Sequence, residues 1–375
     1  MSLDRRALLA LGASAAATPA LAAPASSRLG DPIAGWTVIN ALGGLLDPNT
    51  PDLPKVAMTP RILGDAHASG MTAVNCTLGY VFGPKEPFES TVADVAYWDR
   101  LVRENPRDLL KVFTTADIAR AKAEKKIGLI YGFQNCAMMG KDAKRVDVFA
   151  DMGVRVFQLT YNNENQLGGG SMAPEDRGLT PFGREVVERI NAARGMVDLS
   201  HSGRQICLDA ARASKQPISI NHTGCRALTD LPRNKTDEEL RLVADKGGFV
   251  GIYFMPFLNL SGHATAADVV AHIEYAVKVC GEDHVGIGTD GGTTQIDDLE
   301  AYKTALTKEH EERVAKGISA PGERADTHPF ADDLRGPGQF RKLERLLAAH
   351  GHKPARIEKI LGGNFVRYAR DIWGA

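Results

Sequence analysis

The chain has 375 residues, of which 43% are hydrophobic and 24% are charged, and its formal net charge is −1. This composition supplies enough apolar material for a large buried core and excludes an intrinsically disordered chain. Lysine and arginine are spread along the sequence rather than clustered, so we expect no nucleic acid as a partner.

The first segment has the features of an export signal. Arg5 and Arg6 precede a short apolar run, Leu8–Ala17, and Ala20–Ala22 supplies a cleavage site. The adjacent arginines favour the twin-arginine route, although an ordinary secretory signal has the same general pattern. We therefore predict a signal peptide over residues 1–23 and a periplasmic mature chain. No later run of about twenty unbroken apolar residues occurs, so we expect no membrane span.

Short apolar runs alternate with amphipathic segments along the rest of the chain. The predicted strands are Trp36–Asn40, Thr72–Leu78, Ile127–Phe133, Val154–Tyr161, Met196–His201, Ile218–His222, Phe249–Phe254 and Val285–Asp290. The predicted helices between and after them are Val92–Arg103, Thr115–Glu124, Arg184–Arg194, Gln205–Ala213, Glu238–Asp245, Ala266–Val279 and Gln339–His350. Continuous apolar strands alternating with helices are typical of a parallel sheet covered by helices. Eight such units favour a closed (β/α)8 barrel of the TIM type.

The predicted domain is one barrel over residues 24–375. After the eighth strand, residues 293–338 are charged and rich in glycine and proline, which indicates a long excursion near the barrel mouth, followed by C-terminal helices. The five cysteines lack CxxC spacing. Some could pair in an oxidising compartment, which would leave at least one free, and otherwise we expect small buried side chains: Cys76, Cys136, Cys207, Cys225 and Cys280.

Polar residues end several of the predicted strands, which is where an α/β barrel carries its chemistry. His201 and His222 end two neighbouring strands, and Asp290 ends the last one. Imidazole nitrogen suits Zn²⁺, and a nearby carboxylate can take a proton from water. Each residue alone could equally cap its strand, but three at one end favour a site.

The same segments carry a family resemblance. They are Gly195–His201, Pro217–His222, Asp283–Asp290, Gln158–Asn162 and Ile360–Phe365. In order and along nearly the whole mature chain, they resemble the renal (membrane) dipeptidase family. The resemblance implies a metallo-dependent hydrolase barrel with two zinc ions, often dimeric, that cleaves dipeptides.

Individual residues of this chain match roles in that family. The resemblance implies that His201 and His222 bind one zinc and that Asp290 handles the catalytic water. Arg233 and Asn234 fall where the family holds the substrate carboxylate, a task that suits a guanidinium. The alternative for Arg233 is a surface arginine on a loop.

Four positions depart from the family pattern. Leu42 and Gly44 stand where the family has a His-x-Asp pair, Gln134 replaces a bridging glutamate, and Tyr161 replaces a histidine. Leucine and glycine offer no ligand atoms, and a neutral glutamine cannot offset two dications held close together. We therefore predict that the two-metal centre is lost.

Three functions remain open. The first is a metal-dependent dipeptidase or amidohydrolase with one zinc on His201 and His222, and Gln134 or Cys136 as a third ligand. The second is a metal-free lyase or isomerase that uses the two histidines and Asp290, with Tyr161 as proton donor unless it only packs at the rim. The third is a silent binder of small peptides or carboxylates. A homodimer is expected from the resemblance alone.

Overall fold

The computed structural model describes residues 30–50, 57–315, 319 and 324–374. Chain contacts divide the protein into Met1–Asp31 and Pro32–Ala375, and every described helix and strand belongs to the second unit. The predicted signal peptide, residues 1–23, lies outside the described residues and stays a prediction.

The described strands form one parallel sheet that curls into a nearly closed barrel. They are β1 (Ile39–Gly43), β2 (Ala73–Thr77), β3 (Leu109–Lys111), β4 (Ile127–Phe133), β5 (Val154–Gln158), β6 (Met196–Asp198), β7 (Ser219–Thr223), β8 (Phe249–Ile252) and β9 (Val285–Ile287). Their order is β1-β2-β4-β5-β6-β7-β8-β9, and β3 pairs with β4 outside this path. Asp290 N–H donates to Leu42 O at 2.9 Å and brings the last strand back to the first. The predicted TIM-type barrel is confirmed.

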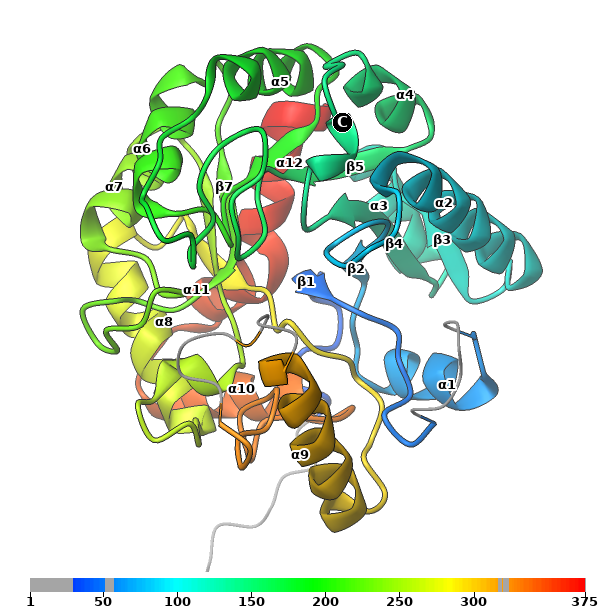
Figure 1. Cartoon of the computed structure of the whole chain (residues 1–375). Coiled ribbons are helices and arrows are strands. Elements are labelled where there is room, and N and C mark those ends of the chain that lie inside the picture. The colour runs from blue at the N-terminus through cyan, green and yellow to red at the C-terminus, as the bar shows by residue number, and fades with distance from the viewer. Residues whose placement is uncertain (1–29, 51–56, 316–318, 320–323, 375) are drawn as a thin grey trace, which may run out of the picture. The chain divides into compact units, whose positions relative to one another are not determined.

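Helices surround the strands (Figure 1). They are α1 (Pro60–Ala68), α2 (Pro87–Glu104), α3 (Thr115–Ala123), α4 (Arg145–Asp151), α5 (Pro181–Ala192), α6 (Arg204–Ala213), α7 (Asp237–Asp245), α8 (Ala266–Cys280), α9 (Leu299–Ala315), α10 (Gln339–Ala349), α11 (Pro354–Glu358) and α12 (Asn364–Trp373). Threonine is the N-cap of α1, α3, α5, α7 and α8, and three of these helices have a full capping box. A threonine hydroxyl satisfies otherwise unpaired backbone N–H groups, which fixes where each helix begins.

Packing closes the amino end of the barrel and leaves the carboxyl ends of the strands for the site. Phe249, at the start of β8, contacts Phe365 and Tyr368 of α12 with ring centroids 5.3 and 6.0 Å apart. All seven residues of β4 are buried, as expected for a strand covered on both faces. The rigid part of the fold therefore supports the residues that follow each strand.

Two predicted features differ in the structure. The short strand β3 has only three residues, too few to show a period, and it was missed. The excursion after the last strand contains the helix α9, which has no buried residue and therefore no apolar stripe in its sequence. The five cysteines are all buried and free, in agreement with the interpretation as small core side chains.

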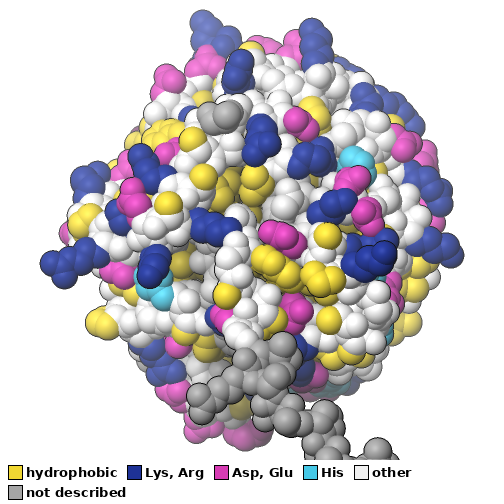
Figure 2. Space-filling view, turned by 180° about the vertical axis from the view of Figure 1, so that it is seen from behind, with side chains coloured by type: hydrophobic (Ala, Val, Ile, Leu, Met, Phe, Trp, Pro, Cys, Tyr) yellow, Lys and Arg dark blue, Asp and Glu magenta, His cyan; other side chains and the backbone are white. Residues whose placement is uncertain are grey.

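Charges of both signs are interspersed on the face opposite to that of Figure 1 (Figure 2). On this face apolar side chains lie between the charged ones, and some of them adjoin near its centre. Within the described part of the chain, no helix combines the length and the apolar character that crossing a membrane requires.

Candidate active site at the barrel mouth

Four of the predicted site residues line one cavity of about 300 Å³: Tyr161, His201, Arg233 and Asp290. They follow β5, β6, β7 and β9, so the carboxyl ends of separated strands bring them together. His222, the fourth residue of β7, lies behind them, and its ring centroid is 4.9 Å from that of His201.

The ring of His201 is held in one orientation. It stacks on Tyr161 with centroids 4.2 Å apart and an interplanar angle of 25°. Its Nδ1 lies 2.6 Å from Asn162 Oδ1. An amide oxygen only accepts, so Nδ1 carries the proton and Nε2 keeps its lone pair. Arg233 Nη2 lies 3.2 Å from Nε2 and donates to it.

His222 is fully buried, yet both of its ring nitrogens lack a partner among the described residues. Its backbone N–H donates to Ser200 Oγ at 3.1 Å, which fixes the chain at this point. Burial, aided by the charge of Arg233, lowers the pKa of His201 and His222 well below the usual value for histidine. Both imidazoles are therefore neutral at neutral pH, which is the form that binds metal ions.

Arg233 is a buried cation, only 2% exposed. Its Nη1 donates to Ser200 O at 2.6 Å, and its guanidinium carbon lies 5.9 Å from the centroid of the Tyr253 ring. Its charge acts on the nearby Asp290 carboxyl group, whose pKa it lowers. Burying a charge is costly unless anions lie close to it, so a carboxylate bound in the cavity would stabilise this guanidinium.

Asp290 combines a strained backbone with a shifted pKa. Its φ is +57°, in the left-handed region that aspartate tolerates better than most residues. Burial raises its pKa to about 6, while the charge of Arg233 and a hydrogen bond from the side chain of Gln134 act in the opposite direction. A carboxyl group with such a pKa can exchange protons near neutral pH.

The residues fit one metal ion better than two. Leu42 is buried in β1 without ligand atoms, and Gly44 has no side chain. The side chain of Gln134 donates a hydrogen bond to the Asp290 carboxyl group. Burial raises the pKa of the Cys136 thiol, which disfavours the thiolate that binds metals. His201 and His222, both neutral and one without any partner, remain as the two ligands of a single ion.

The surroundings of Asp290 and Gln134 bear on the number of ligands. Within the described ranges, His201, His222 and Asp290 do not form a group whose ligand atoms all lie within 4.8 Å of one another. The side chain of Gln134 acts on the Asp290 carboxyl group, and its role as a third ligand stays a prediction. Asp290 is therefore available as a base beside the two imidazoles.

The expected role of Asn234 in substrate binding stays a prediction, and its observed contacts lie within the protein. Its Nδ2 donates to Thr229 O at 2.7 Å and to Phe257 O at 2.9 Å, and Tyr253 Oη donates to its Oδ1 at 2.5 Å. Asn234 is buried and lines neither cavity at the mouth. These contacts join the loop that carries Arg233 to the chain after β8, so Asn234 helps to position Arg233.

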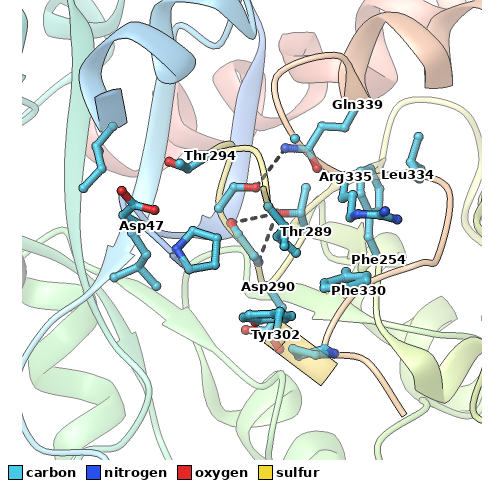
Figure 3. Close-up of a pocket in the computed structure, with 18 of the residues that line it drawn as sticks. Asp47, Phe254, Thr289, Asp290, Thr294, Tyr302, Phe330, Leu334, Arg335 and Gln339 are labelled. Atoms are coloured by element: carbon cyan, nitrogen blue, oxygen red, sulfur yellow. Dashed lines mark hydrogen bonds between the residues drawn. The ribbon is translucent and has the colours of Figure 1, made fainter. Parts of the chain in front are cut away.

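Asp290 also lines a second cavity, of about 440 Å³ (Figure 3). Its apolar lining includes Leu46, Phe254, Tyr302 and Phe330. The rings of Tyr302 and Phe330 stack with centroids 6.1 Å apart. Sequence analysis missed these two aromatic residues because they lie in the excursion, where no strand end marks them.

Asn162 is a further residue that received no role from the sequence. It lies next to Tyr161 in one of the segments that carry the resemblance, and that adjacency was the available signal. Its contact with His201 fixes which ring nitrogen is free. Asn162 thus prepares an imidazole for binding without facing the reaction itself.

Comparisons with known proteins identify the family of the chain. The sequence profile of the family described as "Membrane dipeptidase (Peptidase family M19)" matches residues 67–318. An uncharacterized dipeptidase of Schizosaccharomyces pombe is 28% identical over 77% of this chain and 71% of its own length. An amidohydrolase from Pseudomonas aeruginosa is 32% identical, with a TM-score of 0.76 over 92% of this chain and 98% of that one. A metallopeptidase from Rhodobacter sphaeroides, solved with a phosphinate mimic of L-Ala-D-Ala, shares the fold at 19% identity and a TM-score of 0.71, over 90% of this chain and 99% of that one.

Proposed function

The chain belongs to the membrane dipeptidase family, peptidase family M19, and we propose that it hydrolyses dipeptides or related small amides with one divalent ion in place of two. Membership makes it a metal-dependent hydrolase of the dipeptidase type. The observation that carries the proposal is the buried guanidinium of Arg233, which faces the same cavity as His201 and Asp290.

His201 and His222 are the residues that would hold the ion, and zinc is the ion that two imidazoles suit best. An ion bound there supplies Lewis acidity toward the amide carbonyl oxygen. Arg233 Nη2 now uses the lone pair of His201 Nε2, so the guanidinium and the ion compete for this nitrogen. We therefore expect weaker metal binding than in a site with three protein ligands.

The chain's own residues divide the remaining work. Arg233 binds the carboxylate of the substrate, which relieves the cost of its buried charge. Asp290 takes a proton from the attacking water as the oxygen bonds to the amide carbon. It then gives that proton to the leaving nitrogen as the C–N bond breaks. Tyr161, at the rim of the cavity, is placed to donate a hydrogen bond to the carbonyl oxygen.

The two cavities beside Asp290 suggest what the substrate carries. The cavity with Arg233 suits a carboxylate, and the larger cavity with Leu46 and Phe254 suits an apolar side chain. A dipeptide with a free carboxyl group and one apolar residue satisfies both. The substrate is therefore a small molecule rather than a protein.

The site of action and the assembly state are also proposals. The predicted signal peptide supports a periplasmic location, which cell fractionation with a cytoplasmic marker enzyme tests. The family resemblance supports a homodimer, which light scattering of the mature chain tests.

Metal analysis and activity together test the proposed function. We expect His222→Ala to lower the zinc content by one ion per chain and to abolish turnover across a dipeptide panel. His350→Ala, on a half-exposed histidine, serves as the matched control and should change neither. Unchanged turnover after exhaustive chelation, or in His222→Ala, would overturn the proposal.

The contact between Arg233 and His201 Nε2 favours a second candidate, a metal-free lyase or isomerase. In that case activity survives chelation and is lost in Asp290→Asn, because asparagine cannot accept the proton that the carboxylate would take from the substrate. A silent binder would instead raise Tm with ligand and release no product. The same panel with and without chelator separates these outcomes.

A further inference from the structure

A second group of metal-ligating side chains lies outside the site described above. It consists of His263, His328 and Asp332, and the potential ligand atoms of the three residues all lie within 4.8 Å of one another. No other such group of three occurs within the part of the chain that the structure describes. Two imidazoles and one carboxylate form a donor set that zinc and other divalent transition metals favour.

The three residues are already in contact. His328 Nδ1 lies 2.6 Å from Asp332 Oδ1, and His263 Nδ1 lies 3.7 Å from Asp332 Oδ2. A zinc–nitrogen bond is about 2.0–2.1 Å, so ligand atoms around one ion are about 3.3 Å apart. Only small side-chain movements separate the observed arrangement from such a geometry. His328 is 11% exposed, whereas His263 is 39% exposed, so one ligand is fixed and the other is open to solvent.

Hydrogen bonds from backbone N–H groups hold together the two segments that carry these residues. Asp332 N–H donates to Ala264 O at 2.8 Å, and Ala266 N–H donates to Asp333 Oδ1 at 2.7 Å. Gly262 has a φ of +77°, and a Cβ there would lie 2.4 Å from a methyl carbon of Thr327. The segments therefore approach at a distance that only glycine permits. The ligands are placed by the fold rather than by flexible surface chains.

Two of the nearby cations are engaged by carboxylates outside the ligand set, and Arg335 Nη1 donates to the backbone oxygen of Asp332. Arg324 is engaged by Asp326 through contacts of 2.8 and 2.7 Å, and Lys303 is engaged by Glu300 at 2.8 Å. Asp326 Oδ2 lies 3.4 Å from His263 Nε2, whereas Asp332 faces the other ring nitrogen, so Asp326 stays outside the ligand set. A water molecule would complete the tetrahedral coordination.

We propose that His263, His328 and Asp332 bind a divalent transition-metal ion of the zinc class that holds residues 324–333 against the loop before α8. This segment forms a wall of the barrel mouth. His328 lines the smaller cavity beside Asp290, and Phe330 lines the larger one. The rings of His328 and Phe330 stack with centroids 5.3 Å apart. We call the metal site formed by His263, His328 and Asp332 the lid site. Ion binding there fixes the wall of both substrate cavities, and the ion itself takes no part in hydrolysis.

Metal counting tests the lid site independently of the mouth. In the His201→Ala/His222→Ala variant, where the mouth can hold no ion, dialysis against Zn²⁺ should leave one ion per chain. Adding His263→Ala or Asp332→Asn should remove it. Adding His350→Ala and His352→Ala instead should leave the ion bound, although these two histidines also contact one carboxylate, Glu274. Co²⁺ should give intense visible bands of four-coordinate geometry that disappear in His263→Ala.

Absence of an ion from the His201→Ala/His222→Ala variant, or its retention in His263→Ala, would overturn the lid site and leave the proposed function untouched. If the double variant does not fold, His263→Ala in the otherwise unchanged chain should lower the zinc content by one. Hydrogen exchange gives a second measurement: Zn²⁺ should slow exchange of residues 324–333 in the unchanged chain and have no effect on them in His263→Ala. Equal exchange with and without Zn²⁺ in the unchanged chain would contradict the lid role.

Discussion

The two halves of the barrel mouth differ in what their strands supply. The ends of β5, β6 and β7 supply Tyr161, His201 and His222, whose rings contact one another. The ends of β1 and β4 supply Leu42, Gly44 and Gln134, in which no side chain is charged. The first half holds neutral imidazoles beside a buried guanidinium, and the second holds a neutral amide and aliphatic groups.

This difference supports the proposal that the site has lost the ligands of one half and kept those of the other. The chain after β1 contributes Leu46 and Pro48 to the larger cavity, so the half without ligands borders space for an apolar group. Asp290, which follows the last strand, lies where the halves meet and lines both cavities. Asp290 is therefore the one predicted site residue that contacts both cavities.

Asp290→Asn tests the residue that lies where the two halves of the mouth meet. We expect kcat to fall by about 10²–10⁴-fold, because asparagine cannot accept a proton. Asparagine suits the position because it tolerates the positive φ. Steady-state kinetics on the best dipeptide measures the loss, and a variant with the kcat of the unchanged chain would remove Asp290 from the mechanism.

The Tm measured at two pH values provides the control for Asp290→Asn. The pKa of Asp290 is about 6 in the folded chain, against about 3.9 in an unfolded one. Folding therefore favours the protonated carboxyl, and the stability it contributes is lost as pH rises through about 6. Asparagine does not ionise, so Asp290→Asn should have a higher Tm than the unchanged chain at pH 8 and a similar Tm at pH 4.

Arg233→Met tests the half of the mouth that holds the imidazoles and the guanidinium. Loss of a hydrogen bond to a charged group costs about 1.5–3 kcal/mol, so KM for a dipeptide should rise by about 10–150-fold. The effect should be absent for the C-terminal amide of the same dipeptide, which lacks the carboxylate. Zinc affinity should increase, because His201 Nε2 becomes free. Arg226→Met, on an exposed arginine of the same loop bound to Asp230, is the matched control.

Much of this half could be predicted from the sequence. His201 and Asp290 each end a predicted strand, and the carboxyl ends of parallel strands meet at one mouth. Residue type at a strand end is therefore enough to propose a site. The family resemblance marked Leu42 and Gln134 as departures at ligand positions, and the loss of the second ion stays a prediction.

The contacts inside the mouth could not be predicted. The Arg233–His201 contact joins residues from different loops, and the engagement of Gln134 by Asp290 depends on side-chain conformation. Asn234 is adjacent to Arg233 and yet turns into its own loop. Neighbours in sequence thus serve different tasks, and only packing decides which one faces the cavity. The lid site could not be predicted from the sequence for the same reason, because His263 and His328 come from distant segments.

Restoring the lost half tests whether its backbone still fits an ion. Leu42→His, Gly44→Asp and Gln134→Glu together should raise the zinc content by one ion per chain. A Cβ on residue 44 would lie 3.3 Å from two atoms of Leu46, a flexible side chain that has to shift slightly. Elemental analysis measures the gain, with Leu42→His alone as the control that should gain none. An unchanged content would show that the strand ends of β1 and β4 have also moved apart.

The smallest expected effect concerns the contact between Gln134 and Asp290. The base must be ionised to accept a proton, so kcat/KM should fall as pH decreases through about 6, the pKa of Asp290. Gln134 donates to this carboxyl group and lowers its pKa, so Gln134→Leu should move the acid limb of the profile to higher pH. Gln166→Leu removes an amide that bonds only Cys136 O and Ala137 O, and it should leave the limb in place. An acid limb that is the same in both variants would mean that Asp290 does not set it and that the two halves act separately.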